Sequence, residues 1–416
     1  MKGMRHILWL CTLFIMVCAW ACTQVETVDM SDRPSTSLLK MSFNWNGEDA
    51  DKPNRLHVIA ARNIMTWRAH GYVDTDHGNN PWFGFTQPII EEGAVEPDTL
   101  TNDSTSDSLT IAPNDTTTRY PFRLKGGEYS MLVVNCGDSW DNMDLKCLRK
   151  ENNDTTGTDD TSLNAYLTDN TRKASELFLC IRPLDEKPDV VKDKDLPDFN
   201  PKFEYITDVP RIFYGLQTNI NVVPGFDTEV MLDMEPISQE VQIVFTIELN
   251  GNIQLIEAPI VEMSGICGQF NLMDEYVDTT KLYRSAVVSE LESQSGNQLV
   301  YKARFHTLGI IPSADSTYLN GPGVFQVAVR AVSTSPGTTN TEGRYVYAGI
   351  NPHTELSESQ IIVMDENGKP RLRFSREPVI VNVEKHLVIN ENFLIDSGKG
   401  LGWEQHDPDN DINVDI

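Results

Sequence analysis

The segment VQIVFTIELNGNIQLI, residues 241–256, carries the clearest structural signal in the chain. Its large apolar residues occupy every second position from Val241 to Leu249, the period that places side chains alternately on the two faces of a strand. Asn250 and Gly251 follow directly, and this dipeptide is a strong signal for a tight turn between paired strands. The segment predicts a half-buried β-strand that enters a hairpin.

Other stretches repeat the pattern on both sides of this one. Strands are predicted in LLKMSFNW, in RLHVIAA and in FRLKGGEYSMLVV, where Gly126-Gly127 marks a turn or bulge. After residue 256 the same pattern returns in GVFQVAVRAV, RYVYAGI, SQIIVMDENGKPRLRF and PVIVNVEKHLVI, with a second turn signal at Asn367-Gly368. The stretch HVIAARNIMTWRAH also fits a helical face. Short strands separated by turn signals predict an all-β protein built from antiparallel sandwiches.

Length and charge limit the possible organisation and partners. The chain has 416 residues, more than one ordinary hydrophobic core, so two domains are expected. Its formal net charge is −27, which repels nucleic acid and anionic surfaces and suits a soluble exported protein.

The first residues have the composition of an export signal. Lys2 and Arg5 provide the positive start, and Ile7 to Ala21 form an apolar stretch too short to span a bilayer comfortably. Lipoprotein processing needs a small residue before the acylated cysteine. Ala21 precedes Cys22, whereas Cys11 and Cys18 follow larger residues. Cleavage after Ala21 and lipidation of Cys22 are therefore predicted. An ordinary secretory cleavage at Ala19-Trp20-Ala21 remains the alternative.

The remaining cysteines agree with lipidation. Removal of the signal leaves five cysteines, an odd number for an exported protein, and acylation of Cys22 reduces the set to four. Cys136 and Cys147 flank a polar loop, so a disulfide between them is possible, as are two buried free thiols. Cys180 and Cys267 lie in apolar runs typical of a core.

These features predict four consecutive regions. They are a signal peptide (1–21), a flexible tether (22–37), an N-terminal sandwich domain (38–232) and a C-terminal sandwich domain (233–416). The N-terminal domain contains two insertions, 96–118 and 151–162, rich in Thr, Ser, Asp and Asn. Their Asp-Thr/Ser triplets are similar to the O-glycosylation triplet of the Bacteroidota.

No catalytic pattern is evident. The chain lacks GxxxxGK[ST], HExxH, GxSxG and CxxC, the minimum residues of phosphate-loop enzymes, zincins, α/β-hydrolases and thiol or zinc sites. A protein without enzymatic activity, cofactor or metal is expected.

Five segments together resemble a known group. They are MSFNW (41–45), GGEYSMLVVN (126–135), VPRIFYG (209–215), EMSGICGQFNL (262–272) and FHTLGI (305–310). In these the chain resembles the fimbrillin-like lipoproteins of the Bacteroidales, which build or anchor surface fimbriae. The resemblance implies two transthyretin-like β-sandwich domains, partners that are other fimbrillin-like subunits, and an outer-membrane location on the cell surface.

The resemblance also raises the question of proteolytic maturation. In stalk subunits of this family, an arginine-specific protease removes the first strand, and a donor strand from the next subunit fills the groove. Here Arg33 is the only arginine between Cys22 and the first strand, and Pro34 follows it. Proline after the scissile bond opposes such cleavage, because it lacks an N–H and its ring restricts the extended substrate path. An uncut, lipid-bound subunit resembles the family's anchor. The segment from Trp403 to Ile416 would be the candidate donor strand.

The sequence thus predicts a surface lipoprotein that acts as a fimbrial anchor, accessory or adhesion subunit. The main alternative is a glycan-binding lipoprotein of a polysaccharide-uptake system, in which Trp67, Trp82 and Trp140 would stack on sugars. A secreted glycoside hydrolase is the third hypothesis.

Overall fold

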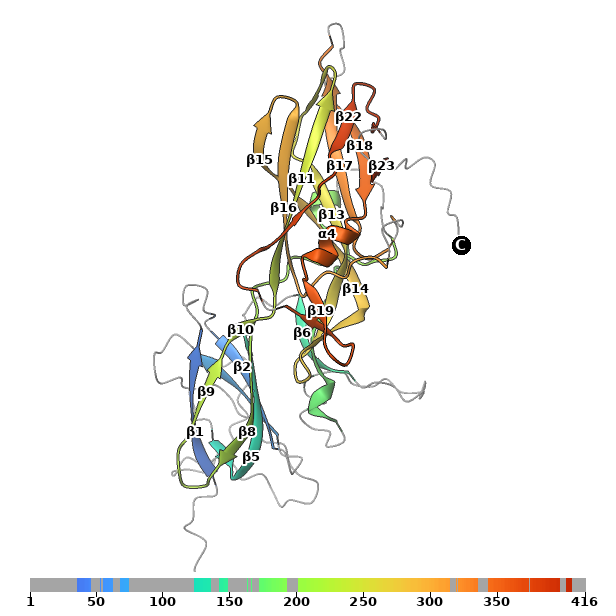
Figure 1. Ribbon diagram of the computed structural model, residues 1–416. Coiled ribbons are helices and arrows are strands. Elements are labelled where there is room, and N and C mark those ends of the chain that lie inside the picture. The colour runs from blue at the N-terminus through green and yellow to red at the C-terminus, as the bar shows by residue number, and fades with distance from the viewer. Residues whose placement is uncertain are drawn as a thin grey trace, which may run out of the picture.

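The computed structural model is built almost entirely from strands (Figure 1). It describes residues 36–45, 53, 55–62, 68–74, 123–135, 142–148, 163, 166, 172–192, 201–314, 319, 321–335, 343–373, 375–396 and 402–405. The predicted all-β sandwich class is confirmed. Within these residues, no helix is both long and apolar enough to cross a membrane.

The N-terminal sandwich consists of two facing sheets. One has the strand order β4-β1-β9 and the other β10-β8-β5-β2-β3. Their apolar side chains interlock in one cluster that includes Leu39, Trp45, Tyr129 and Phe213, all at most 5% exposed. The strands are β1 (Thr36–Asn44), β2 (Arg55–Arg62), β3 (Arg68–Asp74), β4 (Arg123–Lys125), β5 (Gly127–Asn135), β8 (Phe213–Val222), β9 (Thr228–Asp233) and β10 (Glu235–Pro236).

The C-terminal sandwich is larger. One sheet has the order β15-β16-β11-β21, and β22 also pairs with β11. The facing sheet has the order β23-β18-β17-β13-β7-β6, to which β12 and β14 add at β17 and β13. The strands are β6 (Met143–Cys147), β7 (Leu177–Ile181), β11 (Gln239–Asn250), β12 (Ile253–Leu255), β13 (Ile260–Asn271), β14 (Tyr276–Val288), β15 (Glu290–Ser295), β16 (Gln298–Thr307), β17 (Phe325–Ser333), β18 (Arg344–Ile350), β21 (Val379–Asn382), β22 (Leu387–Asn390) and β23 (Trp403–Gln405).

Two strands of this sheet come from the first half of the chain. β7 pairs antiparallel with the end of β13, and β6 pairs with β7, so residues 143–181 contribute to a sheet whose other strands follow residue 252. The predicted boundary between the two domains, at residues 232 and 233, therefore stays a proposal. β1 begins at Thr36, within the last residues of the predicted tether.

The strand predicted first, β11, is confirmed with strict alternation of buried and half-buried residues. The predicted hairpin at Asn250-Gly251 is wrong. β11 pairs with β16 on one side and with β21 and β22 on the other, so neither edge is open to the segment that follows. The chain instead crosses to the opposite sheet, where β12 pairs with β17.

Other turn and strand predictions have mixed outcomes. A turn at Asn367-Gly368 joins β19 (Ile362–Met364) to β20 (Pro370–Leu372) in a hairpin, as predicted. Residues 55–62 and 68–74, which also fitted a helix, form the paired strands β2 and β3. Most strand pairs are antiparallel, but β1 with β9 and β11 with both β21 and β22 are parallel. The described helical turns are short: Ala174–Glu176, α3 (Asp189–Lys192) and α4 (His353–Glu358).

Two glycines in the SGICG segment allow close packing around β13. Gly265 has φ +80°, and a Cβ there would lie 2.4 Å from the backbone nitrogen of Gly323. At Gly268, a Cβ would lie 2.1 Å from the ring of Tyr283 on the paired strand β14. The backbone therefore accepts only glycine at these two positions without rearrangement.

A buried polar cluster fixes a crossing segment to the C-terminal sandwich. Residues 204–206 run beside β14, where Ile206 N–H donates to the Arg284 carbonyl. The Tyr205 hydroxyl donates to Glu262 Oε2 at 2.6 Å, and the Arg284 guanidinium lies 3.9 Å from the Tyr205 ring centre. Glu262 and Arg284 form an ion pair at 3.5 Å, with each side chain 5% exposed. Together these contacts tie the crossing segment to β13 and β14.

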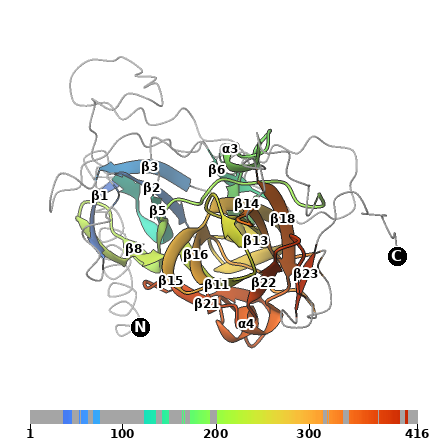
Figure 2. The same cartoon turned by 90° about the horizontal axis from the view of Figure 1, so that it is seen from above.

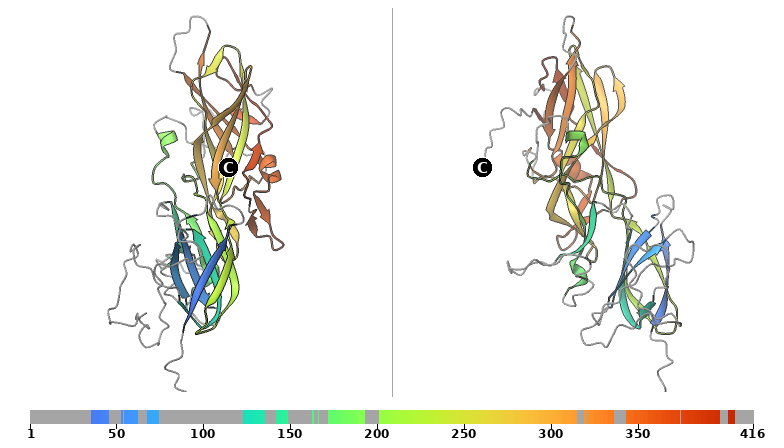
Figure 3. Two further views of the ribbon diagram at one scale, coloured as in Figure 1. Left: turned by 90° about the vertical axis from the view of Figure 1, so that its left-hand side faces the viewer. Right: turned by 180° about the vertical axis from the view of Figure 1, so that it is seen from behind.

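The two sandwiches meet through the outer face of the five-stranded N-terminal sheet. Tyr214 on β8 packs edge-on against Phe270 on β13, with ring centres 6.0 Å apart, and its hydroxyl donates to the Leu272 carbonyl. Ile59 and Val134 on the same sheet belong to the hydrophobic cluster of the C-terminal sandwich. The sandwiches are displaced sideways from one another (Figure 2) and form an elongated molecule (Figure 3).

Candidate assembly surfaces and the junction pocket

A groove lies at the end of the C-terminal sandwich that points away from the N-terminal one. We call it the distal groove; its volume is about 610 Å³. It lies where β11 and β15 end and β12 and β16 begin, at the top of Figure 1. The lining residues are Leu249, Gly251, Ile253, Gln254, Leu255, Ile256, Glu257, Leu291, Gln294, Gly296, Asn297, Leu299 and Tyr301.

The groove has an apolar base, whereas the surface that it exposes is more polar than apolar. Leu249, Ile253, Leu299 and Tyr301 are less than 10% exposed, whereas Ile256 is 40% and Leu291 50% exposed to solvent. The long Ile and Leu side chains thus form an accessible rim above a buried apolar base. A concave surface with an apolar base and polar groups around it can accept an extended segment of another protein.

Strand β15 forms one wall of the groove and is an edge strand. It pairs with β16, and no other described strand pairs with its outer side. All six of its residues are exposed, and a register shift occurs between Leu291 and Ser293. Glu290 pairs with Arg304 at 3.0 Å and Glu292 pairs with Lys302 at 2.8 Å. Charges and a bulge limit indiscriminate edge pairing, so a partner would have to match this particular edge.

The candidate donor segment begins as a strand of its own sheet. Trp403–Gln405 form β23, which pairs antiparallel with β18. Trp403 is 2% exposed, and its indole N–H donates to the Lys385 carbonyl at 2.7 Å. Residues 406–416 lie outside the described residues. Trp403 is therefore a core residue of this chain.

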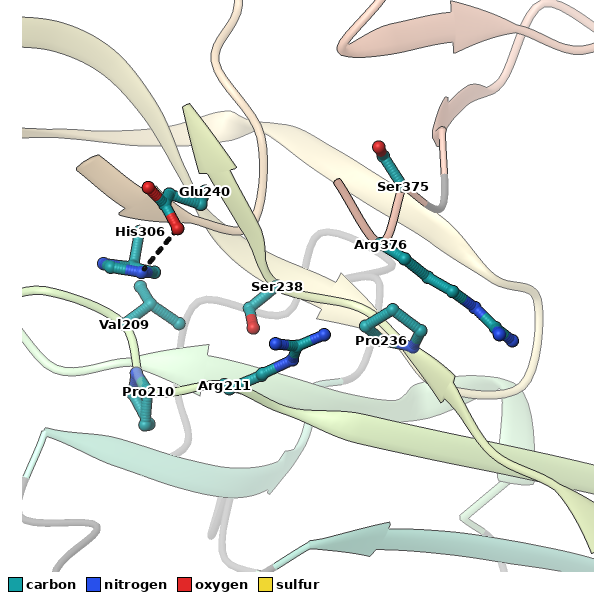
Figure 4. A pocket seen from close by; sticks show the side chains of 9 residues that line it. All are labelled: Val209, Pro210, Arg211, Pro236, Ser238, Glu240, His306, Ser375 and Arg376. Carbon is teal, nitrogen blue, oxygen red and sulfur yellow. Dashed lines mark ion pairs between the residues drawn. The ribbon is translucent and has the colours of Figure 1, made fainter. Parts of the chain in front are cut away.

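A second pocket, of about 220 Å³, lies at the junction of the two sandwiches (Figure 4). The VPRIFYG segment supplies part of one wall, and FHTLGI supplies His306 from β16. The lining residues are Val209, Pro210, Arg211, Pro236, Ser238, Glu240, His306, Ser375 and Arg376. Ser238 Oγ accepts the Ile212 N–H, and Arg376 pairs with Glu235 at 3.3 Å. Two of the segments that carry the family resemblance thus meet where the sandwiches join.

His306 on β16 contacts the segment that precedes β8 and the neighbouring strand β11. Its Nδ1 lies 3.8 Å from Asp208, and its Nε2 lies 3.7 Å from Glu240, the pair drawn in Figure 4. Its carbonyl accepts the Val209 N–H at 3.2 Å. The nearby Asp208 carboxylate raises the pKa of His306, and the charge of Glu240 adds to it, while burial and Arg211 act in the opposite direction.

This pKa shift predicts a pH dependence of stability. Because the pKa of folded His306 lies above its usual value, the ion pairs contribute fully at acidic pH, and the contribution disappears as pH rises through the raised pKa. We expect the native chain to lose up to about 1 kcal/mol of unfolding free energy above pH ~6.5 through this group. The difference between the native chain and His306→Gln in urea denaturation should therefore shrink as pH rises. A constant difference would contradict the assignment, and Asp208→Asn should reduce the pH dependence.

Most site residues predicted from sequence fall outside the described residues. These are Ala21, Cys22, Arg33, Pro34, Cys136, Trp67, Trp82 and Trp140, together with both Thr/Asp-rich insertions. Lipidation, cleavage, glycosylation and sugar stacking at these positions stay predictions.

Cys147 is described and buried, and it forms no disulfide with another described cysteine. Its Sγ lies 3.7 Å from Glu176 Oε2. Burial, with the nearby Glu176 carboxylate, raises the pKa of this thiol to about 11, so it stays protonated at neutral pH. Pairing with Cys136 is not tested, because that residue lies outside the described part of the chain. Cys180 and Cys267 are buried free thiols, as their apolar context predicted.

Several residues that shape these surfaces have no distinct sequence signal. Glu262 and Arg284 are 22 positions apart and become a buried pair only when β13 and β14 align. Leu291 becomes a groove residue only because β15 is an edge strand. His306 and Asp208 lie in segments far apart in sequence. The sequence signals nearest to the junction of the sandwiches were the segments VPRIFYG and FHTLGI, which carry part of the family resemblance.

Comparison with known proteins finds similarity in structure alone. No protein-family model matches the chain, and no curated protein matches its sequence. A proposed adhesin from Bacteroides ovatus is 9% identical, with 84% of this chain and 97% of that chain covered and a TM-score of 0.41. A proposed adhesin from Bacteroides thetaiotaomicron is 12% identical, with 89% and 96% covered and a TM-score of 0.39. The fimbrial anchor protein Mfa2 from Porphyromonas gingivalis is 11% identical, with 78% and 85% covered and a TM-score of 0.32.

These structures are described as adhesins and as a fimbrial protein of Bacteroidales, the kind of protein that the sequence resemblance indicated. At such low identities and TM-scores, the likeness is too distant to transfer their roles to this chain.

Proposed function

We propose that this protein is a lipid-anchored surface subunit of a fimbria, acting without catalysis as an anchor, accessory or adhesion subunit. Acyl chains on Cys22 would hold the amino terminus to the outer membrane. The C-terminal sandwich would present a strand edge to a fimbrillin-like subunit. The partner would add a strand or insert an apolar segment at the distal groove.

The observation that carries this proposal is that the start of β1 and the distal groove lie at opposite ends of an elongated molecule (Figures 1 and 3). β1 starts at the outer end of the N-terminal sandwich, so the preceding tether leaves from there. The distal groove and the end of β15 lie at the other end. A protein fixed at one end and open to strand contacts at the other is suited to link a membrane to an assembly.

The strand β1 itself supports an uncut subunit. It lies between β4 and β9, pairing with both, and buries Leu39 and Met41 in the core, with Trp45 buried directly after it. Its removal would leave a long apolar gap in the N-terminal sandwich. An anchor subunit does not need such a gap, because it accepts no donor strand there. This agrees with the proline that follows Arg33, which opposes cleavage before β1.

The groove can be tested by replacing one accessible apolar side chain. Leu291→Arg places a charge on the rim of the distal groove, where the side chain is 50% exposed, so the fold should tolerate it. The matched control is Ile380→Arg on β21, at the opposite edge of the same sheet and 57% exposed. We expect Leu291→Arg to lower recovery of fimbrillin-like subunits from detergent-solubilised envelopes by about tenfold or more, measured by pull-down and mass spectrometry.

Equal recovery by the native chain, Leu291→Arg and Ile380→Arg would show that the groove does not bind the subunit. Recovery of a TonB-type transporter in place of fimbrillin-like subunits would favour the polysaccharide-uptake hypothesis instead.

A further inference from the structure

The turn between β8 and β9 exposes an apolar group at the outer end of the N-terminal sandwich. Residues 223–227 are all exposed, with Phe226 70% and Val223 45% accessible to solvent. In Figure 1 this turn is at the end of the molecule farthest from the C-terminal sandwich. Leaving a whole aromatic ring in water costs free energy that burial elsewhere would recover. The turn is therefore a candidate contact surface.

The turn is held firmly in this position. Gly225 N–H donates to the Thr36 carbonyl at 3.1 Å, and Phe226 N–H donates to the Val223 carbonyl at 3.2 Å. The Ser37 hydroxyl donates to the Phe226 carbonyl. Pro224 packs so closely over Gly126 that a Cβ at that glycine would lie 2.5 Å from the proline ring. The apolar side chains are thus presented outward by an ordered backbone.

The same contacts place the turn beside the point where the chain arrives from Cys22. Thr36 is the first residue of β1, fourteen positions after Cys22 in the sequence. A flexible segment of this length has a root-mean-square span of roughly 20 Å and a maximum of roughly 50 Å. With Cys22 acylated, which is part of the proposed function, the turn stays within a few nanometres of the lipid headgroups.

Charges at this end do not repeat the strong negative balance of the whole chain. Arg123 and Lys125 lie on β4, opposite Leu38 and Thr36 of β1, and Lys40 pairs with Asp227 at 2.7 Å. Acidic residues here include Glu128 and Glu229 along with Asp227. Among these six, three basic side chains offset three acidic ones, whereas the chain as a whole carries −27. This end can therefore approach a phospholipid surface with little net repulsion.

We propose that Phe226 and Val223 form a membrane contact that inserts into the interfacial layer of the lipid next to the acyl anchor. Aromatic side chains flanked by Lys and Arg suit that layer, where an apolar ring is buried while charged groups stay hydrated. The contact would add a second fixed point beside the predicted lipid anchor. It would hold the long axis of the protein away from the membrane, with the distal groove facing outward.

The test measures binding without the acyl chains. The mature chain, residues 22–416, with Cys22→Ala is mixed with vesicles of phosphatidylethanolamine and phosphatidylglycerol, and the bound fraction is measured by co-sedimentation. Adding Phe226→Ser and Val223→Ser should lower the partition coefficient by about tenfold or more. The control Met364→Ser removes an equally exposed apolar side chain, 67% accessible, from the β19–β20 hairpin and should leave binding unchanged.

A second variant reports insertion directly. Phe226→Trp in the same background should show a blue-shifted fluorescence emission when vesicles are added, whereas Met364→Trp should not. No vesicle binding by the parent, or equal binding by the double variant, would overturn the proposal. So would a change in self-association on ultracentrifugation, which would make the turn an interface between two copies. Because no acyl chain is present, these outcomes are independent of whether Cys22 is lipidated.

Discussion

Replacing Glu262 by glutamine is expected to lower the free energy of unfolding by about 3–5 kcal/mol. The change keeps the shape of the side chain but removes the negative charge that pairs with Arg284, and both side chains are only 5% exposed. The arginine would keep its charge in a site with little access to water. Urea denaturation monitored by circular dichroism measures the loss.

A matched control exists on the surface of the same sandwich. Glu290 pairs with Arg304 at 3.0 Å, but the two side chains are 64% and 48% exposed. Glu290→Gln should therefore cost no more than about 1 kcal/mol. Replacing both buried partners, Glu262→Met with Arg284→Leu, should recover much of the lost stability. A loss below about 1 kcal/mol for Glu262→Gln would show that the pair is far better hydrated than its burial indicates.

Replacing Cys22 by alanine is expected to move nearly all of the protein from the membrane fraction to the soluble fraction. Each buried methylene of an acyl chain contributes about 0.8 kcal/mol to membrane binding, so multiple chains hold the protein almost permanently. The apolar turn at Phe226 provides only a weak contact without them. Immunoblotting of fractionated cells measures the distribution.

The control for this experiment is Cys18→Ala. Cys18 follows Val17, which is larger than lipoprotein processing accepts, so this change should leave the protein in the membrane. Mass spectrometry of the mature protein should find an acylated Cys22 at the amino terminus. An unmodified Cys22 would contradict the lipid anchor, and a chain that starts at Pro34 would contradict both the anchor and the absence of cleavage at Arg33.

The sequence predicted the strands well and their partners poorly. The apolar alternation from Val241 to Leu249 is a local property, and β11 has it as expected. Which strand pairs with which depends on contacts between residues far apart in the chain. Asn250-Gly251 indicated a hairpin, but both edges of β11 are already paired. The turn at Asn367-Gly368 succeeded because β19 and β20 each had a free edge for the other.

The same contrast between local signals and long-range contacts holds for the candidate surfaces. The segments VPRIFYG and FHTLGI carried part of the family resemblance, and they meet at the junction of the sandwiches. Their composition could not show that His306 would face Asp208, because that contact requires the segment around Asp208 to lie against β16. Phe226 follows Pro224-Gly225, which predicts a turn. Its exposure became visible only once β8 and β9 were placed in opposite sheets.

The position of β6 and β7 affects how the protein reaches its folded state during secretion. The apolar strand LFLCI, 177–181, emerges well before its partner β13, which begins at Ile260. At ordinary rates of synthesis, roughly 4–16 s separate the two strands. Throughout that interval, LFLCI has an unsatisfied edge that could aggregate or join the wrong strand. With export as proposed, periplasmic chaperones that protect such edges should limit the yield of this protein more than the rate of its translation does.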